Sequence, residues 1–416
     1  MFENELVKTT LIKKNKRAVN PAPTTSRSGH WGFRFGYPPR THVSLPCSAK
    51  QGGLTNGALW CGVKTKIIFY AFLVLVILFL ILLVFISINK SGEGQMQKGL
   101  TSSSSLNSSD SKAEIKPFAF QELTIPYLSS RNYESAMNEL QINSTGVNYT
   151  SYLTSYTSDG LKINAQLTKP NEETPAGGFP AIIFVHGYIL PSSYQTLSNY
   201  NSYVDYLSEN GFVVFKIDLR GNGNSEGEAG GAYYSGDYVI DTLNAREALK
   251  TLDFVNPQKI GLWGHSMAGN VVFRSFVAGK NIPAVVIWAG AVYSYEDWQK
   301  YGLNDNSYRP PGTSSERQRR RQELFDTYGE FDPNSSFWRQ VVPINYLDGV
   351  KGAVQLNHAV DDTVVNIGYS RDLNRILNDT LIPHEFNEYR NGGHNISGAA
   401  FNQSMQNTVR FFKEKL

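Results

Sequence analysis

A serine in the segment 260–269 has the surroundings of a catalytic nucleophile. The segment reads IGLWGHSMAG, so an apolar run leads directly into Ser266 and a helix-like pattern follows at once. A strand, a sharp turn and a helix in this order form a nucleophile elbow, which presents a serine hydroxyl above a sheet. The strand and the helix approach closely there, so small residues are needed two positions either side of the serine. Gly264 and Ala268 supply them, and Ser266 is the predicted nucleophile.

A second serine matches the bare G-x-S-x-G pattern more literally. Ser225 lies in GNSEG at 223–227, whereas the Ser266 site has Ala268 in place of the last glycine. Ser225, however, belongs to a glycine-rich loop with no helix directly after it. Because the pattern is informative only between a strand and a helix, Ser266 is preferred and Ser225 is the alternative.

A serine hydroxyl needs a base, and the base needs an orienting acid. In hydrolases with a nucleophile elbow the chain order is Ser, then Asp or Glu, then His. Downstream of Ser266 the segment VQLNHAVDD at 354–362 ends in two carboxylates, Asp361 and Asp362. His394 lies farther on, in a glycine-rich loop after the last strand-like segment. Asp361 is the predicted acid, with Asp362 as the alternative, and His394 is the predicted base.

The neighbouring histidines are interpreted as structural. His265 adjoins the nucleophile in sequence, but its side chain should point elsewhere in a sharp turn. His186 is interpreted as stabilising a turn, and His358 as supporting the loop that carries the acid. His384 begins a strand-like segment.

Acyl transfer also requires N–H donors for the developing oxyanion. The backbone N–H of Met267, directly after the nucleophile, is the first predicted donor. The loop HGY at 186–188 follows the apolar run 181–185, and Gly187 permits a tight turn there. The backbone N–H of Tyr188 is the second predicted donor.

The elements that must position these residues alternate between strand-like and helix-like patterns. An opening hairpin is predicted from the Asp159-Gly160 turn. Alternation of this kind predicts an α/β fold with a doubly wound, mostly parallel sheet. The expected strands cover 149–156, 161–168, 181–185, 212–217, 259–263, 284–289, 353–356 and 384–389, and the expected helices 200–207, 239–252, 270–277, 315–328, 367–377 and 399–413.

The alternation is interrupted by a polar insertion at 293–347. An insertion of this size between two strands is expected over the carboxyl edge of the sheet, where ligands of α/β proteins bind, and it is interpreted as a lid. Its helix carries RQRRR at 317–321, which would attract an acidic substrate or simply form a solvated face.

The mean hydropathy of −0.31 over 416 residues excludes a transporter with many spans. One span is nevertheless predicted at 67–88, which holds 22 residues without a charge. At ~1.5 Å per residue this helix covers a ~30 Å hydrocarbon core. Residues 1–66 carry a net charge of +9 and the rest −6, so the positive-inside rule keeps the short segment cytoplasmic and exports the long one.

The predicted organisation therefore has four parts. Residues 1–66 form a disordered basic tail, 67–88 a membrane anchor in the lipid bilayer, 89–116 a Ser-rich linker and 117–416 the enzyme domain. The sequence contains no G-x-x-x-x-G-K-[ST] and no H-E-x-x-H, and the exported part contains no cysteine pair. No cofactor, no metal and no nucleic-acid partner are expected.

Several segments together resemble the α/β-hydrolases, and more narrowly the catalytic domain of prolyl oligopeptidases and its dienelactone-hydrolase-like relatives. They are FVHG at 184–187, FKIDLRGNGNS at 215–225, WGHSMAG at 263–269, NHAVDDTV at 357–364 and GGH at 392–394. The similarity covers about 160–416. It implies Ser266, Asp361 and His394 as the catalytic triad, an acyl-enzyme mechanism and no cofactor.

The chain departs from the prolyl oligopeptidase pattern in three places. Asn357-His358 replaces the usual His-Gly before the acid motif, Ala268 replaces a glycine, and residues 117–160 are too few for a β-propeller. The expected function is a membrane-anchored, extracytoplasmic serine hydrolase of small carboxylic esters. A prolyl-oligopeptidase-like peptidase and an inactive hydrolase-fold binding module are the alternatives.

Overall fold

The computed structural model describes residues 117–230, 232–303 and 315–416. The predicted basic tail, the predicted span at 67–88 and the predicted linker at 89–116 lie outside the described residues. In the part of the chain that the structure describes, no helix is long and apolar enough to cross a bilayer.

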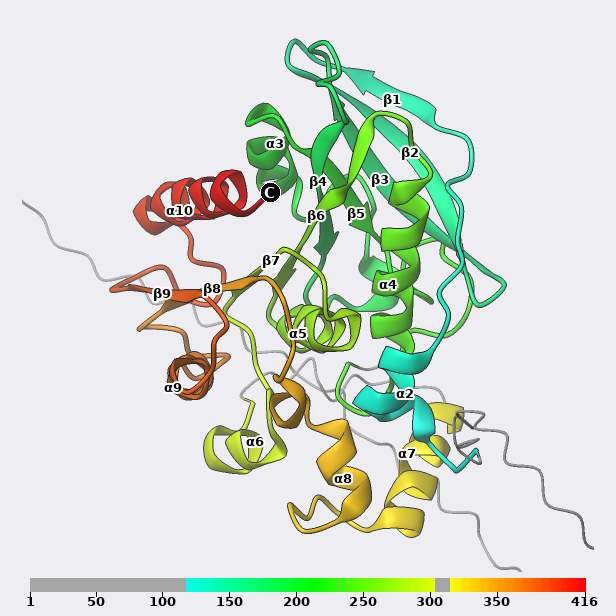
Figure 1. Ribbon diagram of the computed structural model, residues 1–416, viewed down its shortest axis with the longest axis vertical. Helices are drawn as coiled ribbons and strands as arrows, with labels where there is room; N and C mark the ends of the chain where they lie inside the picture. Colours follow the sequence, from blue (N-terminus) through cyan, green and yellow to red (C-terminus); the bar gives the residue numbers. More distant parts are fainter. Residues whose placement is uncertain (1–116, 231, 304–314) are drawn as a thin grey trace, which may run out of the picture. The chain divides into compact units, whose positions relative to one another are not determined.

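The described residues build one mixed sheet of nine strands in the order β1-β2-β3-β5-β4-β6-β7-β8-β9 (Figure 1). The pairs from β1 to β5 along this order are antiparallel, and all pairs from β5 to β9 are parallel. The strands are β1 (Gln141–Thr145), β2 (Tyr149–Ser158), β3 (Leu161–Pro170), β4 (Phe179–Val185), β5 (Val213–Ile217), β6 (Val255–His265), β7 (Ala284–Trp288), β8 (Ala353–Ala359) and β9 (His384–Tyr389).

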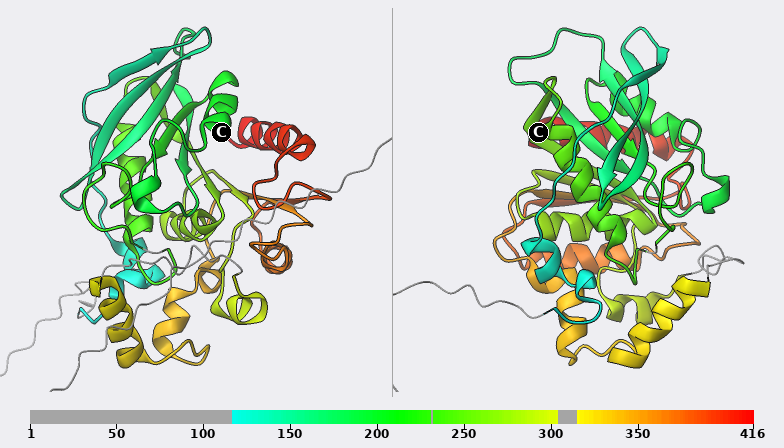
Figure 2. Two further views of the ribbon diagram at one scale, coloured as in Figure 1. Left: turned by 180° about the vertical axis from the view of Figure 1, so that it is seen from behind. Right: turned by 90° about the vertical axis from the view of Figure 1, so that its right-hand side faces the viewer.

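Helices cover both faces of this sheet, as the alternating pattern predicts (Figures 1 and 2). Helices α4 and α5 pack on one face, where α9 also contributes to the buried cluster, and α3 and α10 pack on the other. The prediction of an α/β sheet wound on both sides is confirmed. These helices are α3 (Asn201–Glu209), α4 (Asp237–Lys250), α5 (Met267–Gly279), α9 (Gly368–Asn378) and α10 (Ala399–Lys415).

The predicted hairpin is present as β2 and β3. Asp159 and Gly160 form its two-residue turn with φ angles of 52° and 80°. Two consecutive positive φ angles match the right-handed twist of the flanking strands, which is why Asp-Gly is favoured there. The strand β1, which pairs with β2 at the sheet edge, was not predicted, because its fully exposed polar sequence carries no apolar alternation.

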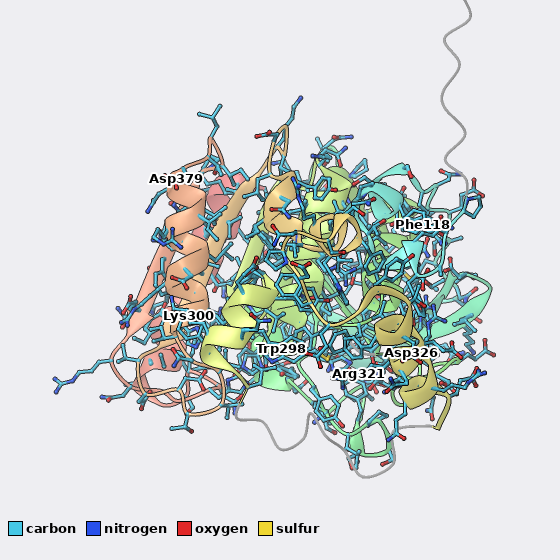
Figure 3. All side chains as sticks on the ribbon, turned by 90° about the horizontal axis from the view of Figure 1, so that it is seen from below. Phe118, Trp298, Lys300, Arg321, Asp326 and Asp379 are labelled. Carbon is cyan, nitrogen blue, oxygen red and sulfur yellow. The ribbon has the colours of Figure 1, made fainter. Side chains whose placement is uncertain are left out.

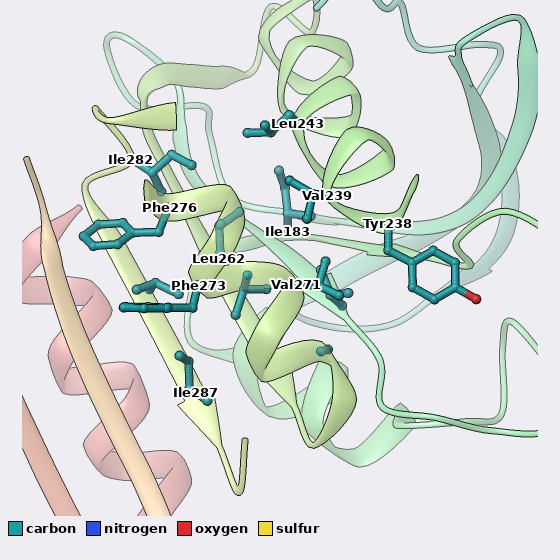
Figure 4. Packing of buried hydrophobic residues seen from close by; sticks show 14 of the residues in the cluster. Ile183, Tyr238, Val239, Leu243, Leu262, Val271, Phe273, Phe276, Ile282 and Ile287 are labelled. Atoms are coloured by element: carbon teal, nitrogen blue, oxygen red, sulfur yellow. The ribbon is translucent and has the colours of Figure 1, made fainter. Parts of the chain in front are cut away.

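Helix α4 is buried on more sides than its sequence pattern predicts. The apolar stripe predicts one buried face that leaves out Ile240 and Leu243, yet these side chains are only 3% and 4% exposed. The helix packs against α5 as well as against the sheet, so residues off the stripe are covered too. Figure 4 shows Leu243 and Val239 of α4 in the core that also contains Leu262 of β6.

The insertion between β7 and β8 holds three α-helices and the short 3-10 helix η4 (Pro343–Tyr346) in the described residues. Helix α7 (Ser315–Tyr328) has the predicted bounds, whereas α6 (Tyr295–Tyr301) and α8 (Ser336–Val341) were not predicted. Helices of six or seven residues are too short to show a periodicity. Ser294 and Asp297 begin α6 with a capping box, in which each side chain accepts from the other residue's backbone N–H.

The insertion has its own apolar cluster, which also takes in the amino-terminal element η1 (Gln121–Leu123) through Leu123. The next helix, α2 (Ile125–Ser130), packs in the main core through Ile125 and Leu128. Tyr234 connects this cluster to the main domain. The guanidinium of Arg321 in α7 lies 4.4 Å from the Tyr234 ring, and the Trp298 ring of α6 lies 5.5 Å from it. Figure 3 shows Trp298 and Arg321 on the same lower side of the molecule.

Candidate active site

Ser266 occupies the sharp turn between β6 and α5. Its backbone has φ 56° and ψ −121°, a conformation that L-residues adopt rarely and that stores strain. The turn is held by the Ser266 N–H, which donates to the Trp288 carbonyl at 2.9 Å. The strand, turn and helix expected around this serine are all present, with Ser266 as the residue directly before α5.

The need for a small residue before the turn is visible at Gly264. A methyl group there would lie 2.7 Å from the Ala268 carbonyl oxygen and 2.8 Å from Cγ2 of Val272. Neither atom belongs to a flexible chain end, so any side chain at this position would separate β6 from α5. The pairing of Gly264 with Ala268 therefore lets the strand and the helix cross at the distance that exposes the serine.

A continuous chain of hydrogen bonds joins Ser266, His394 and Asp362. Nδ1 of His394 lies 2.8 Å from Oδ2 of Asp362, and Nε2 of His394 lies 2.8 Å from Oγ of Ser266. A carboxylate only accepts, so Nδ1 carries the hydrogen; Nε2 of a neutral ring is then the acceptor, and the Ser266 hydroxyl donates to it. The serine proton points at the base that would remove it.

The structure corrects the predicted acid. The preferred candidate, Asp361, makes no hydrogen bond to the His394 side chain; its carboxylate accepts from the backbone N–H groups of Gly393 at 2.8 Å and Gly392 at 3.3 Å. The next residue, Asp362, reaches the imidazole. The two aspartates thus hold the same loop in different ways, since Asp361 binds its backbone and Asp362 binds its histidine.

Asp362 is placed so that it stays ionised. Its side chain is buried, which by itself would raise the pKa, but hydrogen bonds from His358 and His394 and from the Val365 N–H hold the pKa far below the ordinary range. Oδ1 accepts from the N–H groups of Val364 and Val365 at 2.8 and 3.0 Å. The resulting carboxylate can stabilise a positive charge on His394.

His358 supports this carboxylate, in agreement with its predicted role beside the acid. Its Nε2 lies 3.1 Å from Oδ2 of Asp362 and 3.0 Å from the Val365 carbonyl, and its Nδ1 lies 2.8 Å from the Ser370 hydroxyl. Two acceptors face Nε2, so that nitrogen carries a hydrogen. The ring fixes both ends of the turn after β8.

His265 was predicted to have a packing role and instead belongs to a polar network. Its Nδ1 lies 2.7 Å from the Tyr200 hydroxyl, and its Nε2 lies 2.9 Å from the backbone carbonyl of His394. Burial, and then the neighbouring charge of His394, lower the pKa of His265 to about 3, so the ring is neutral. Nε2 donates to the carbonyl, which leaves Nδ1 to accept from Tyr200.

Tyr200 is the site residue that sequence reasoning missed. Its hydroxyl donates to His265 and also accepts from the Gly187 N–H at 3.1 Å. A tyrosine at the start of an amphipathic helix has no chemical signature, and its partners lie 13 and 65 residues away along the chain. Only the folded structure brings them together.

The remaining histidines and the alternative serine have structural contacts. His186 stacks on Tyr194 at 4.2 Å, and its ring nitrogens lie 2.7 and 3.0 Å from the carbonyl oxygens of Gly187 and Asp218. His384 contacts the Asn378 side chain and the Ile382 carbonyl. The Ser225 hydroxyl accepts from the Asn164 N–H at 2.9 Å, which ties its loop to β3.

Two pockets adjoin at the predicted oxyanion donors. The larger, of about 540 Å³, is lined by Ser266 and His394, and the smaller, of about 250 Å³, by Met267. Tyr188 lines both. The two predicted donor residues thus lie beside the nucleophile, at the boundary between the pockets.

Comparison with known proteins agrees with this architecture. The sequence model of the family described as serine aminopeptidase, S33 matches residues 179–304. A 31.7 kDa protein of Escherichia coli, from the traX-finO intergenic region, is 30% identical over 116 residues, which are 26% of this chain and 36% of that protein. The chain thus spans about a third of the length of the curated relative that it matches.

Similar solved structures include both esterases and peptidases. The acetyl xylan esterase of Paenibacillus sp. R4 has a TM-score of 0.50 at 17% identity, over 70% of this chain and 92% of that one. Dipeptidyl peptidase 4 of Porphyromonas gingivalis has a TM-score of 0.50 at 21% identity, over 65% of this chain and 36% of that one. The acylaminoacyl peptidase of Pyrococcus horikoshii has a TM-score of 0.50 at 21% identity, over 65% of this chain and 42% of that one. At these identities the likeness shows a shared fold.

Proposed function

We propose that this chain is a serine hydrolase of the α/β-hydrolase superfamily and that it hydrolyses carboxylic esters through an acyl-enzyme intermediate. The observation that carries the proposal is the unbroken hydrogen-bonded chain from Ser266 through His394 to Asp362. An inactive binding module has no need to keep a strained serine aligned with a base and an ionised acid.

In the proposed reaction Ser266 attacks the ester carbonyl while Nε2 of His394 takes its proton. His394 then gives this proton to the departing alcohol, and an acyl-serine remains. Water attacks the acyl-serine in the second half, again with His394 as the base. Asp362 holds Nδ1 of His394 and stabilises the imidazolium in both halves, in the role first expected of Asp361.

The oxyanion of each tetrahedral intermediate requires two N–H donors. We assign the backbone N–H groups of Met267 and Tyr188. The Met267 N–H lies at the amino-terminal end of α5, where the helix dipole favours negative charge. Tyr188 follows Gly187, whose own N–H is held by Tyr200, so the loop that carries the second donor is anchored.

A peptidase acting on an amino-terminal residue is the second candidate, and one observation favours it. Glu228 lines the smaller pocket, beside Arg317 from α7. A carboxylate in a pocket beside the nucleophile is the group that would bind a free α-ammonium. The presence of Arg317 in the same pocket also supports a lid role for the insertion at 293–347.

The proposed anchor and topology remain as the sequence predicts, with the span at 67–88 and the enzyme domain outside the cytoplasm. The test is cell fractionation of the full chain and of a variant that lacks 67–88. Retention of the full chain in carbonate-washed membranes, loss of that retention in the variant, and protease access to 117–416 from outside are expected. Release of the full chain by carbonate would overturn the anchor.

Labelling with a fluorophosphonate probe tests the nucleophile in the purified full chain. Labelling is expected in the wild type and in Ser225→Ala and is expected to be absent in Ser266→Ala. The same three proteins are then compared on p-nitrophenyl acetate and on alanine p-nitroanilide. Faster turnover of the ester supports the esterase, faster turnover of the anilide supports the aminopeptidase, and turnover by Ser266→Ala contradicts both.

A further inference from the structure

The two pockets beside Ser266 differ in which catalytic residues they contain. His394 and Ser266 line the larger one, whereas Met267 lines the smaller one. They share Tyr188 and Ile189, so they adjoin at the loop that carries the second predicted oxyanion donor. An ester bound with its carbonyl oxygen at these donors would extend into both pockets.

The proposed mechanism decides which half of the ester enters which pocket. His394 must protonate the departing oxygen, so the alcohol portion lies on the side of its imidazole, in the pocket of about 540 Å³. The acyl portion then enters the pocket of about 250 Å³. At ~30 Å³ for each water-sized group, the smaller pocket holds about eight non-hydrogen atoms.

The larger pocket has a lining without formal charge. Among the described residues that line it there is no Asp, Glu, Lys or Arg. Its polar character comes from hydroxyl and amide groups instead. The side chains of Ser198, Ser202 and Asn395 are exposed and make no hydrogen bond within the described ranges 117–230, 232–303 and 315–416.

Aromatic rings accompany these hydroxyl and amide groups. Tyr200 and Tyr203 line the same pocket, with their ring centroids 5.4 Å apart. The Tyr203 hydroxyl donates to the Asn395 carbonyl at 2.9 Å, so this wall is fixed to the loop that carries His394. Neutral hydrogen-bonding groups beside aromatic rings suit a ligand that has many hydroxyls and apolar C–H faces, and they supply no carboxylate, ammonium or guanidinium to pair with a charged one.

From this lining we propose that the alcohol portion of the substrate is a carbohydrate, esterified with a short acyl group. The inference rests on the proposed esterase function and narrows it to one class of substrate. In the reaction the bond between the acyl carbon and the sugar oxygen breaks as the bond to Oγ of Ser266 forms, and the serine proton passes through His394 to the sugar oxygen. Water then releases the short carboxylic acid and restores the serine.

The test compares glucose pentaacetate with ethyl acetate on the purified full chain. These esters share the acetyl group and differ in the alcohol, so the ratio of their kcat/KM values reports the larger pocket. The double variant Ser198→Ala, Ser202→Ala is expected to lower this ratio about tenfold through the loss of two hydrogen bonds to the sugar. Ser193→Ala is the control, because this exposed serine lies five residues before Ser198 in the chain and does not line the pocket.

An unchanged ratio in the double variant, or a ratio that falls equally in Ser193→Ala, would overturn the carbohydrate assignment while leaving the esterase intact. Turnover of neither ester, or faster turnover of alanine p-nitroanilide than of both, would overturn the esterase function itself. Fluorophosphonate labelling of Ser266 in the same sample separates a folded enzyme with another substrate from an inactive chain. The acyl assignment is checked with p-nitrophenyl butyrate, which should react much faster than p-nitrophenyl hexadecanoate.

Discussion

The Tyr200 hydroxyl donates to Nδ1 of His265 across 2.7 Å, and this bond joins the two loops that face Ser266. On one side the same hydroxyl accepts from the Gly187 N–H, next to the predicted oxyanion donor. On the other side Nε2 of His265 donates to the backbone carbonyl of His394. The oxyanion loop and the base are therefore positioned by one buried network.

Replacing Tyr200 by Phe should lower kcat about thirtyfold, since each lost hydrogen bond is worth ~1 kcal/mol and two are removed. KM should change little, because the lost bonds position the loops that carry the catalytic groups, and their loss therefore acts on the reaction step. Steady-state kinetics on p-nitrophenyl acetate measures both. Tyr206→Phe, in helix α3 that begins directly after Tyr200, lies outside both pockets and is the control. Equal losses in the two variants would contradict a positioning role.

A substitution of Gly187 tests the same network at the oxyanion loop, where the Gly187 N–H donates to Tyr200. A methyl group there would lie 2.7 Å from the Tyr200 hydroxyl and 3.2 Å from Nδ1 of His265. Gly187→Ala should therefore lower kcat by at least about tenfold through displacement of the second oxyanion donor. In a Tyr200→Phe background the added cost should be smaller, because the hydroxyl that the methyl meets is gone. Strict additivity of the two changes in kcat would argue against this contact.

Matched substitutions of the adjacent Asp361 and Asp362 test which of the two is the catalytic acid. Asp362→Asn keeps the volume but leaves Nδ1 of His394 without an anionic acceptor, so kcat should fall about 10³- to 10⁴-fold. Asp361→Asn keeps an oxygen for the Gly393 N–H, and a loss of less than about tenfold is expected. The kcat of both variants is measured on one ester at one pH. A larger loss in Asp361→Asn would restore the acid first predicted from the sequence.

The buried carboxyl of Asp297 predicts a dependence of stability on pH. Burial raises its pKa from 3.8 to about 7, although hydrogen bonds from the Ser294 and Tyr293 N–H groups act to lower it. Its Oδ1 has no hydrogen-bond partner in the described part of the chain. The folded protein therefore binds this proton more tightly than the unfolded chain does. The contribution of the protonated carboxyl to the free energy of unfolding is lost as the pH rises from about 4 to about 7.

Asp297→Asn removes this titration while keeping an acceptor for the two N–H groups. The free energy of unfolding of the variant, minus that of the wild type, should increase between pH 4 and pH 7. Urea denaturation at several pH values measures the difference, in which the other titrating groups cancel. A difference that stays constant or decreases over this range would show that the Asp297 carboxyl is ionised in the folded protein.

The nucleophile and the base could be predicted because their signals are local. An apolar strand, Gly264, Ser266 and a helix follow one another within ten residues, and the backbone strain at Ser266 arises from that turn alone. His394 was identified by its place after the last strand in a glycine-rich loop. The order of strands and helices followed from periodicity in the same way, except for short or exposed elements such as α6 and β1.

The acid and the positioning network depended on tertiary structure. Asp361 and Asp362 have the same chemistry, and the path of the turn after β8 decides which one meets His394. Tyr200 and His265 lie 65 residues apart and meet only when the turn before α3 folds onto the end of β6. Sequence by itself determined which groups do the chemistry, and three-dimensional packing decided which neighbours hold them in place.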